Sequence, residues 1–183
     1  KKAETLDIRM ICPLHGPILK ENLGYYIGKY DIWSSYKPED NGTLVAYSSI
    51  YGNTAKVAET IANILKENGE KVVLTDLVRD DMAEAVEDAF RYDKMIVASS
   101  SYNAGIFPPM EEFLNHLKGR NYQNRRIGII ENGSWAPSAG KGMKSILESM
   151  KDISIVEPMI TIKSTMKQGD VDKLKQLAKE ILV

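Results

Sequence analysis

The sequence lacks most of the features that mark exported or membrane proteins. Its 183 residues include one cysteine, Cys12, which excludes an internal disulfide framework and indicates a cytoplasmic protein. No apolar run reaches the roughly 18 residues that a membrane-spanning helix needs. The N-terminal stretch KKAETLDIRM lacks the apolar core of a secretory signal. We therefore expect neither export nor a membrane partner.

An excess of charge is also absent. The chain has 24 basic and 25 acidic residues, so it carries no electrostatic footprint for nucleic acid or an acidic membrane. An initiator methionine is missing, which leads us to expect a fragment or a processed product. The residues that are present, 43% apolar and 27% charged, are typical of a globular protein with one domain and a short addition.

From about residue 43 onward, strand-like and helix-like patterns alternate along the chain. Short apolar runs predict strands, and apolar residues at helical spacing predict helices. Strict alternation implies a parallel sheet with helices on both faces, and right-handed crossovers make it a doubly wound, three-layer α/β/α sandwich. Pro158 suggests an edge position or a bulge for the last strand. The predicted strands are 43–48, 71–77, 94–100, 126–131 and 153–162, and the predicted helices are 53–69, 81–91, 108–119, 138–151 and 170–182.

The first forty residues have a different pattern. Residues 6–12 read as a strand, residues 18–33 as a helix, and residues 34–42 as a linker. We therefore predict a boundary near residue 40, with a short appendage over 1–40 and the α/β domain over 41–183.

The loop after the first predicted strand, SSIYGNT, is suited to an anion. It leads into a helix, whose free N–H groups and dipole favour negative charge. The hydroxyls of Ser49 and Thr54 can donate to phosphate oxygens, and Asn53 can cap the loop. No lysine or arginine lies in the loop and no three-glycine fingerprint is present, which argues against an NTPase or a dinucleotide site. An ordinary capped turn remains the alternative.

Two further loops lie where the third and fourth predicted strands end. Ligands bind at this edge of an open parallel sheet. The segment SSSYNAGIFPP (99–109) offers small residues and the ring of Tyr102, and NGSWAPSAG (132–140) surrounds Trp135 with small residues. Trp135 folded back on its own loop is the alternative. Together the three loops predict a phosphate cradle with two walls for a flat heterocycle.

These three segments resemble the phosphate loop and the two ring-binding loops of flavodoxins, which bind FMN. The resemblance covers residues 43–183 and implies a five-stranded sheet of order 2-1-3-4-5. Tyr51-Gly52, where many flavodoxins have Thr-Gly, is similar to the flavodoxin-like domains of flavodiiron proteins. The residues that the resemblance implies for FMN binding are Ser48, Ser49, Ile50, Tyr51, Gly52, Asn53, Thr54, Ser100, Ser101, Tyr102, Asn103, Ala104, Gly105, Asn132, Gly133, Ser134, Trp135, Ala136 and Gly140.

The segment ICPLHGPI (11–18) holds His15 in a stiff frame between Pro13 and Pro17. Residues 11–36 resemble the junction of flavodiiron proteins, where the last metal-binding histidine of a metallo-β-lactamase-like domain precedes a linker. The resemblance implies that residues 1–40 are the tail of such a domain plus a linker helix, and that His15 is an iron ligand in the full-length protein only. A simple turn is the alternative.

The resemblance also implies a function. FMN would take electrons from a redox partner, such as rubredoxin or a flavin- or deazaflavin-dependent reductase. It would pass them to a diiron centre that reduces oxygen or nitric oxide in a head-to-tail homodimer. No side chain stands out as a catalytic acid, base or nucleophile, so this chain alone is expected to be an electron carrier that is part of an oxidoreductase.

Two other functions remain open. A free-standing NAD(P)H-dependent FMN or quinone reductase would need a nicotinamide-accepting surface, and no arginine cluster lies near the three loops. A response-regulator-like interaction module would need acidic residues at the end of the first strand, where Ser48 and Ser49 stand.

Overall fold

The computed structural model describes residues 5–183, which divide into two compact units between Lys37 and Pro38. The N-terminal unit contains a closed loop and one helix. Ile11 and Leu19 form a single antiparallel bridge, with N–H···O distances of 3.0 and 2.9 Å, and this bridge closes the loop that contains His15. Gly16 in this loop has a φ of 121°, a left-handed conformation that L side chains rarely adopt.

The predicted strand over residues 6–12 is wrong, because only Ile11 pairs and the remaining residues stay irregular. The prolines of this loop have no N–H to give to a ladder, which limits pairing to one bridge. The predicted helix is shorter than expected. It is α1 (Leu23–Ser34) and follows Asn22, which has a left-handed φ of 52°.

The larger unit is built on a parallel sheet. Its five long strands lie in the order β2-β1-β3-β5-β6, and all four of their pairings are parallel. A two-residue strand, β4, pairs antiparallel with the end of β3. Without β4 this is the predicted order, and the doubly wound, flavodoxin-like fold is confirmed. The strands are β1 (Asp40–Ser48), β2 (Val72–Asp76), β3 (Tyr92–Tyr102), β4 (Gly105–Ile106), β5 (Arg125–Asn132) and β6 (Ile153–Ile162).

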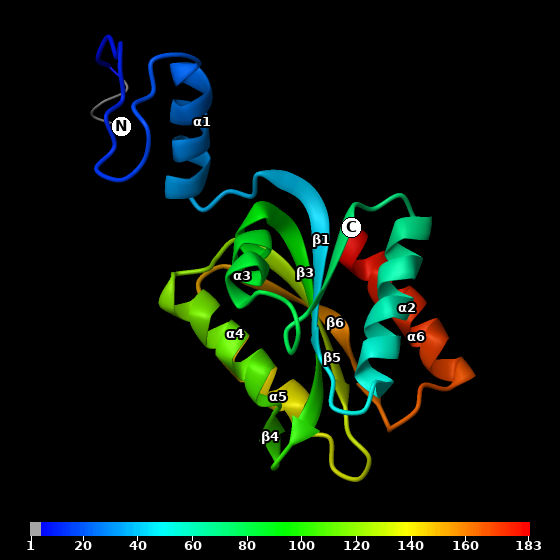
Figure 1. The fold of residues 1–183 in the computed structure, drawn as a ribbon. Coiled ribbons are helices and arrows are strands. Elements are labelled where there is room, and N and C mark those ends of the chain that lie inside the picture. Colours follow the sequence, from blue (N-terminus) through cyan, green and yellow to red (C-terminus); the bar gives the residue numbers. More distant parts are fainter. Residues whose placement is uncertain (1–4) are drawn as a thin grey trace. The chain divides into compact units, whose positions relative to one another are not determined.

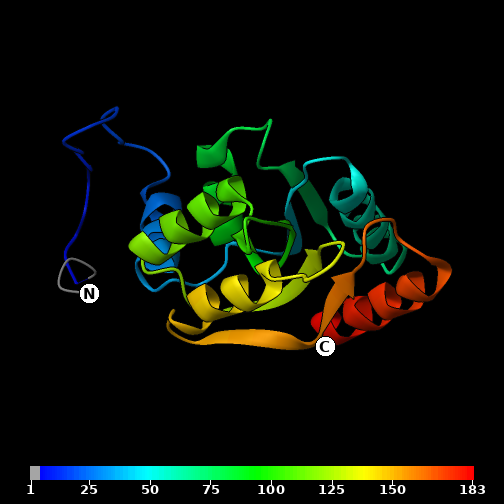
Figure 2. The same ribbon diagram turned by 90° about the horizontal axis from the view of Figure 1, so that it is seen from below.

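Helices cover both faces of this sheet. Figures 1 and 2 show α3, α4 and α5 on one face and α2 and α6 on the other, and two separate core clusters match these two layers. None of the helices within residues 5–183 is long and apolar enough to cross a bilayer. The helices are α2 (Asn53–Glu67), α3 (Met82–Arg91), α4 (Pro108–Gly119), α5 (Ala139–Glu148) and α6 (Gln168–Leu182).

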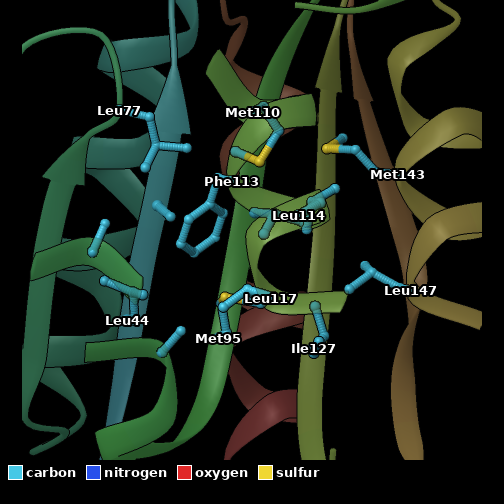
Figure 3. Packing of buried hydrophobic residues seen from close by; sticks show 14 of the residues in the cluster. Leu44, Leu77, Met95, Met110, Phe113, Leu114, Leu117, Ile127, Met143 and Leu147 are labelled. Carbon is cyan, nitrogen blue, oxygen red and sulfur yellow. The ribbon is translucent and has the colours of Figure 1, made fainter. Parts of the chain in front are cut away.

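Alternation along the central strands fills both cores. In β1, Leu44 belongs to the cluster beneath α3, α4 and α5, while the next residue, Val45, belongs to the cluster beneath α2 and α6. Successive side chains of a strand point to opposite faces, so a strand that is buried on both sides reads as a continuous apolar run. Figure 3 shows the first cluster, in which Phe113 and Leu117 of α4 pack beside Met95 of β3.

β6 and β3 each have an irregularity that bears on the predictions. β6 lies at the edge of the sheet, and its register with β5 shifts between Gly128 and Ile130, in line with the prediction from Pro158. β3 runs two residues further than predicted and turns into β4 through Asn103 and Ala104, whose φ angles are 46° and 58°. Positive φ at both central residues is the signature of a type I′ hairpin.

Candidate functional site

The predicted site lies at the carboxyl edge of the sheet. In Figure 1 this edge is at the bottom, where the turns after β1, β5 and β6 and the β3–β4 hairpin meet. The location follows from the topology, because β1 and β3 are neighbours in space while their helices, α2 and α4, cover opposite faces. The crevice beside such a switch point is where open α/β sheets bind ligands.

The turn after β1 presents main-chain donors at the start of α2. Gly52 occupies the N-cap position with a φ of 85°, and no side chain caps the helix. The first helical hydrogen bond runs from the Lys56 N–H to the Gly52 carbonyl at 3.0 Å, so the N–H groups of residues 53–55 precede the helical ladder. The predicted cap by Asn53 is not formed. The Gly52 N–H donates instead to Ser49 Oγ at 3.1 Å.

Buried hydroxyls form the floor behind this turn. Ser48 Oγ lies 3.1 Å from Ser99 Oγ on the neighbouring strand, and Thr54 Oγ1 lies 2.8 Å from Ser100 Oγ. The Ser99 hydroxyl also donates to the Ser100 carbonyl at 3.1 Å. A hydroxyl has one donor and two acceptor positions, so a pair joined by one bond keeps hydrogen-bonding capacity for a ligand.

The loop after β5 (132–140, from here on the third loop) is held by Ser164, a residue that the sequence analysis missed. Asn132 Nδ2 donates to the Ser164 carbonyl at 2.9 Å, and the Ser164 N–H donates to Asn132 Oδ1 at 3.1 Å. Ser134 Oγ lies 2.9 Å from Ser164 Oγ. Ser164 follows β6, the fifth long strand. Reading the carboxyl end of every parallel strand, rather than three of them, would have included it.

These elements enclose a pocket of about 140 Å³ that is lined by uncharged residues. Organic ligands of drug size occupy roughly 300–1,000 Å³, so this volume suits a phosphate-sized group and leaves a flat ring outside. The predicted residues that the structure brings together here are Ser49, Ile50, Tyr51, Asn53, Thr54, Ser100, Ser101, Asn132, Gly133 and Ser134, and Ser164 completes the lining.

Three aromatic side chains near this pocket are exposed. The exposed fractions are 91% for Tyr51, 51% for Tyr102 and 95% for Trp135. Trp135 is therefore not folded back onto its own loop. Tyr102 also contacts the ring of Phe107, with 5.8 Å between the centroids. Of the other predicted residues, Ser48 is buried beneath the pocket, Gly52 heads α2, Asn103, Ala104 and Gly105 form the β3–β4 hairpin, and Ala136 lies in the third loop.

Gly140 does not line the pocket. It lies in the first turn of α5, where its N–H donates to Glu131 Oε2 at 2.8 Å, and a Cβ on it would lie 2.9 Å from that carboxylate. The buried Glu131 was also missed, and it accepts a second hydrogen bond from Thr161 Oγ1 at 2.8 Å. Gly140 is therefore required by packing in the start of α5.

Ser101 has a part in the same helix start. Its Oγ accepts hydrogen bonds from the N–H groups of Ser138 at 2.9 Å and Ala139 at 3.2 Å. A side chain from β3 thus satisfies donors that a helix normally leaves to its own cap.

Tyr47 and Asp76 lie opposite each other at the same edge of the sheet, at the ends of β1 and β2. Burial raises the pKa of Tyr47 to about 12, and the carboxylate of Asp76 adds to this rise. Asp76 is itself paired with Arg79 at 2.6 Å. Tyr47 therefore remains a neutral hydrogen-bond donor at ordinary pH.

Metal-ligand geometry is a separate matter. Within residues 5–183, no three side chains of His, Cys, Asp or Glu gather into a cluster that could hold a metal ion. His15 and Cys12 are both exposed in the N-terminal unit. The described residues therefore do not fit a diiron centre by themselves.

Comparison with known proteins places this geometry in a family. Residues 44–157 match the flavodoxin domain. The chain is 25% identical over 173 residues to the rubredoxin-oxygen oxidoreductase of Megalodesulfovibrio gigas, covering 93% of this chain and 42% of that one. It is 28% identical over 154 residues to the anaerobic nitric oxide reductase flavorubredoxin of Aeromonas hydrophila, covering 82% of this chain and 31% of that one.

Solved structures agree with these matches. A variant of the flavo di-iron protein of Thermotoga maritima superimposes with a TM-score of 0.80 at 27% identity, and the match covers 100% of this chain and 46% of that chain. The chain spans less than half the length of the curated relatives that it matches. The family match covers more than half of the chain, and with the sheet order and the position of the pocket it supports one conclusion: the chain belongs to the flavodoxin domain family.

Proposed function

We propose that this chain binds FMN at the carboxyl edge of its sheet and transfers electrons. The residues fit the group. The N–H groups at the start of α2, with the hydroxyls of Ser49 and Thr54, would hold the phosphate. The exposed rings of Tyr51, Tyr102 and Trp135 would flank the isoalloxazine. When bound, FMN supplies the redox chemistry, and the protein supplies binding and orientation.

The observation that carries this proposal is the uncharged, donor-rich pocket at the start of a 15-residue helix. A site that transfers a phosphoryl group uses a lysine to contact the phosphate that leaves, and this pocket has no lysine. Its neutral donors therefore suit a phosphate that stays bound. The residues of the pocket also argue against the response-regulator-like interaction module. Such a module needs carboxylates at the end of β1, where Ser48 and Ser49 stand.

The names of the relatives suggest the setting. One relative is named for rubredoxin and oxygen and another for nitric oxide. We therefore propose a rubredoxin-type donor and, in a longer protein, a diiron centre as acceptor with oxygen or nitric oxide as its substrate. His15 would be one ligand of that centre, residues 1–40 would belong to the preceding metallo-β-lactamase-like domain and its linker helix, and a homodimer would bring flavin and iron together.

A comparison of FMN with riboflavin tests the proposal. We expect FMN to bind the purified chain one to one. Riboflavin should bind at least tenfold more weakly, since several charge-assisted hydrogen bonds, each worth about 1.5–3 kcal/mol, are lost with the phosphate. Flavin fluorescence during titration measures both affinities. Equal affinity for the two flavins would contradict the assignment of the pocket to phosphate.

A further inference from the structure

A second, basic pocket adjoins the candidate FMN site. Its volume is about 310 Å³, and it is lined by Thr161, Lys163, Lys167, Asp170 and Lys173. The two sites share one stretch of chain. Ser164 holds Asn132 and Ser134 of the third loop, and its neighbour Lys163 lines the basic pocket. An object seated on the lysines therefore lies beside the loop that carries Trp135.

The charge of this surface is local. The chain as a whole has a net charge of −1, yet residues 161–175 contain four lysines and two aspartates. Asp170 accepts a hydrogen bond from the Lys167 N–H at 2.9 Å and pairs with Lys173 at 3.0 Å. The backbone hydrogen bond, followed by the neighbouring lysines, lowers the pKa of Asp170, which keeps this carboxylate ionised. In the part of the chain that the structure describes, Lys163 and Lys167 form no ion pair within 4 Å.

These features favour a protein surface over a small anion. The Asp170 carboxylate already occupies the start of α6, so a bound phosphate would meet a negative charge there. All three lysines are exposed. Their side chains are flexible, and their ammonium groups keep most of their hydration. Surfaces of this kind steer a partner of opposite charge and let it leave again, which matches the small, short-lived interfaces of electron-transfer encounters.

We propose that Lys163, Lys167 and Lys173 form the docking surface for the acidic face of a small electron-transfer protein. The proposal rests on the proposed function, since it names the route by which electrons reach the FMN site. A partner held there would lie beside the third loop, so docking and electron transfer would use the same edge of the sheet.

Amide chemical shifts of the ¹⁵N-labelled chain test the docking surface without any flavin. The probe is an oxidised rubredoxin with an acidic surface, added at low salt. We expect the largest shifts in residues 161–173 and in the third loop, and we expect them to fade at high salt. The variant K163E/K167E should weaken binding roughly tenfold or more, in keeping with the size of electrostatic steering effects.

The matched control is K118E/K151E, which makes the same change of charge near the amino ends of the strands, opposite the candidate FMN site. Lys118 lies in the last turn of α4, and Lys151 lies between α5 and β6. Binding to this control should stay within about twofold of wild type, since distant exposed charges are largely screened. The spectra report whether each variant is folded, and K163Q/K167Q provides a milder change if the reversal disturbs the fold.

Three results would overturn the docking surface. The first is unchanged binding by K163E/K167E, the second is no binding of rubredoxin at low salt, and the third is the same shifts at millimolar NADPH or inorganic phosphate, which would make the pocket a small-anion site. The FMN titration is a separate measurement. If FMN does not bind, the proposed function is wrong. If FMN binds but K163E/K167E binds rubredoxin as wild type does, only the docking surface is wrong.

Discussion

At the scale of single residues, the floor of the candidate FMN site depends on hydroxyls that hydrogen-bond to one another. Ser48 and Ser99 are fully buried and face each other across β1 and β3, and Thr54 reaches Ser100 from α2. Each bond ties a helix or strand to its neighbour at the pocket. The hydroxyls therefore fix the position of the donors before any ligand arrives, which lowers the entropic cost of binding.

Thr54→Ala should weaken FMN binding by about 1–3 kcal/mol, because a hydrogen bond to a charged acceptor and the anchor to Ser100 are both lost. Ser49→Ala should act in the same direction, since Ser49 Oγ holds the Gly52 N–H in place. FMN titration measures the change. Thr60→Ala is the matched control, because its Oγ1 donates to the Lys56 carbonyl further along the same helix. Normal FMN affinity in both pocket variants would show that these hydroxyls do not hold the phosphate.

Trp135 offers a second prediction at this scale. Its side chain is 95% exposed, so the free chain should show the red-shifted emission of a solvated indole. FMN binding should quench that emission, because the ring would lie against the isoalloxazine. Trp135→Phe should remove most of the quenching. The comparison is Trp33→Phe in the N-terminal unit, which should leave the quenching in place. A quenching signal that follows Trp33 would mean that the third loop lies away from the flavin.

The residue types of the site were accessible from the sequence, but some contacts between them were not. Small hydroxylated residues after apolar runs predicted the pocket lining through the topology rule for parallel sheets. The sequence did not predict the roles of Ser164 and Glu131, because each depends on a hydrogen bond to a residue 30 or more positions away. Ser164 bonds with Asn132, and Glu131 bonds with Thr161. Gly140 was assigned to the cofactor by its place in a motif, whereas the Glu131 carboxylate explains it.

At the scale of elements, Glu131 joins three of them. It lies near the end of β5, accepts the Gly140 N–H at the start of α5, and accepts the hydroxyl of Thr161 on β6. A buried carboxylate is costly unless its oxygens are hydrogen-bonded, and here each oxygen has one donor. The two hydrogen bonds therefore tie the end of β5 to the start of α5 and to β6 at the base of the third loop.

Gly140→Ala should disrupt this junction. A Cβ would lie 2.7 Å from Met159 Sδ and 2.9 Å from the Glu131 carboxylate, so the free energy of unfolding should fall by about 1–3 kcal/mol, the usual cost of overpacking. Urea unfolding followed by circular dichroism measures this. Gly169→Ala in α6 is the control, because nothing lies within 4 Å of its added Cβ and alanine favours a helix. Equal stability of the two variants would contradict the junction.

The elements themselves were largely predictable, since both faces of β1, β3 and β5 are buried and their sequences are continuous apolar runs. Prediction failed where local pattern and pairing disagree. Ser101 and Tyr102 read as a loop by composition, yet they continue β3 because β4 returns to pair with them through Asn103 and Ala104. Residues 6–12 read as a strand, yet a strand needs partners, and only Leu19 pairs with this segment.

At the scale of the whole molecule, the two units differ in how well they are packed. The unit from Pro38 onward has two apolar cores, whereas α1 has no buried residue and exposes Tyr25, Tyr30 and Trp33. A helix without a buried face is held mainly by its own hydrogen bonds, and a helix of 12 residues is marginal on that basis. We therefore expect the amides of residues 5–37 to exchange with solvent faster than those of the sheet, as hydrogen-exchange mass spectrometry can measure.

The His15 proposal leads to a prediction at the same scale. Metal sites need several ligands that converge, and no such cluster exists within residues 5–183. Ferrous iron added to this chain should therefore be lost on desalting, while FMN stays bound and is retained by His15→Ala as well. In a longer protein that carries an upstream metal domain, the iron content should be two per chain, and His15→Ala should lower it without changing the flavin content. Metal analysis with flavin absorbance measures both quantities. Stoichiometric iron held by the 183-residue chain through His15 would instead mean that the closed loop between Ile11 and Leu19 is a metal site of its own.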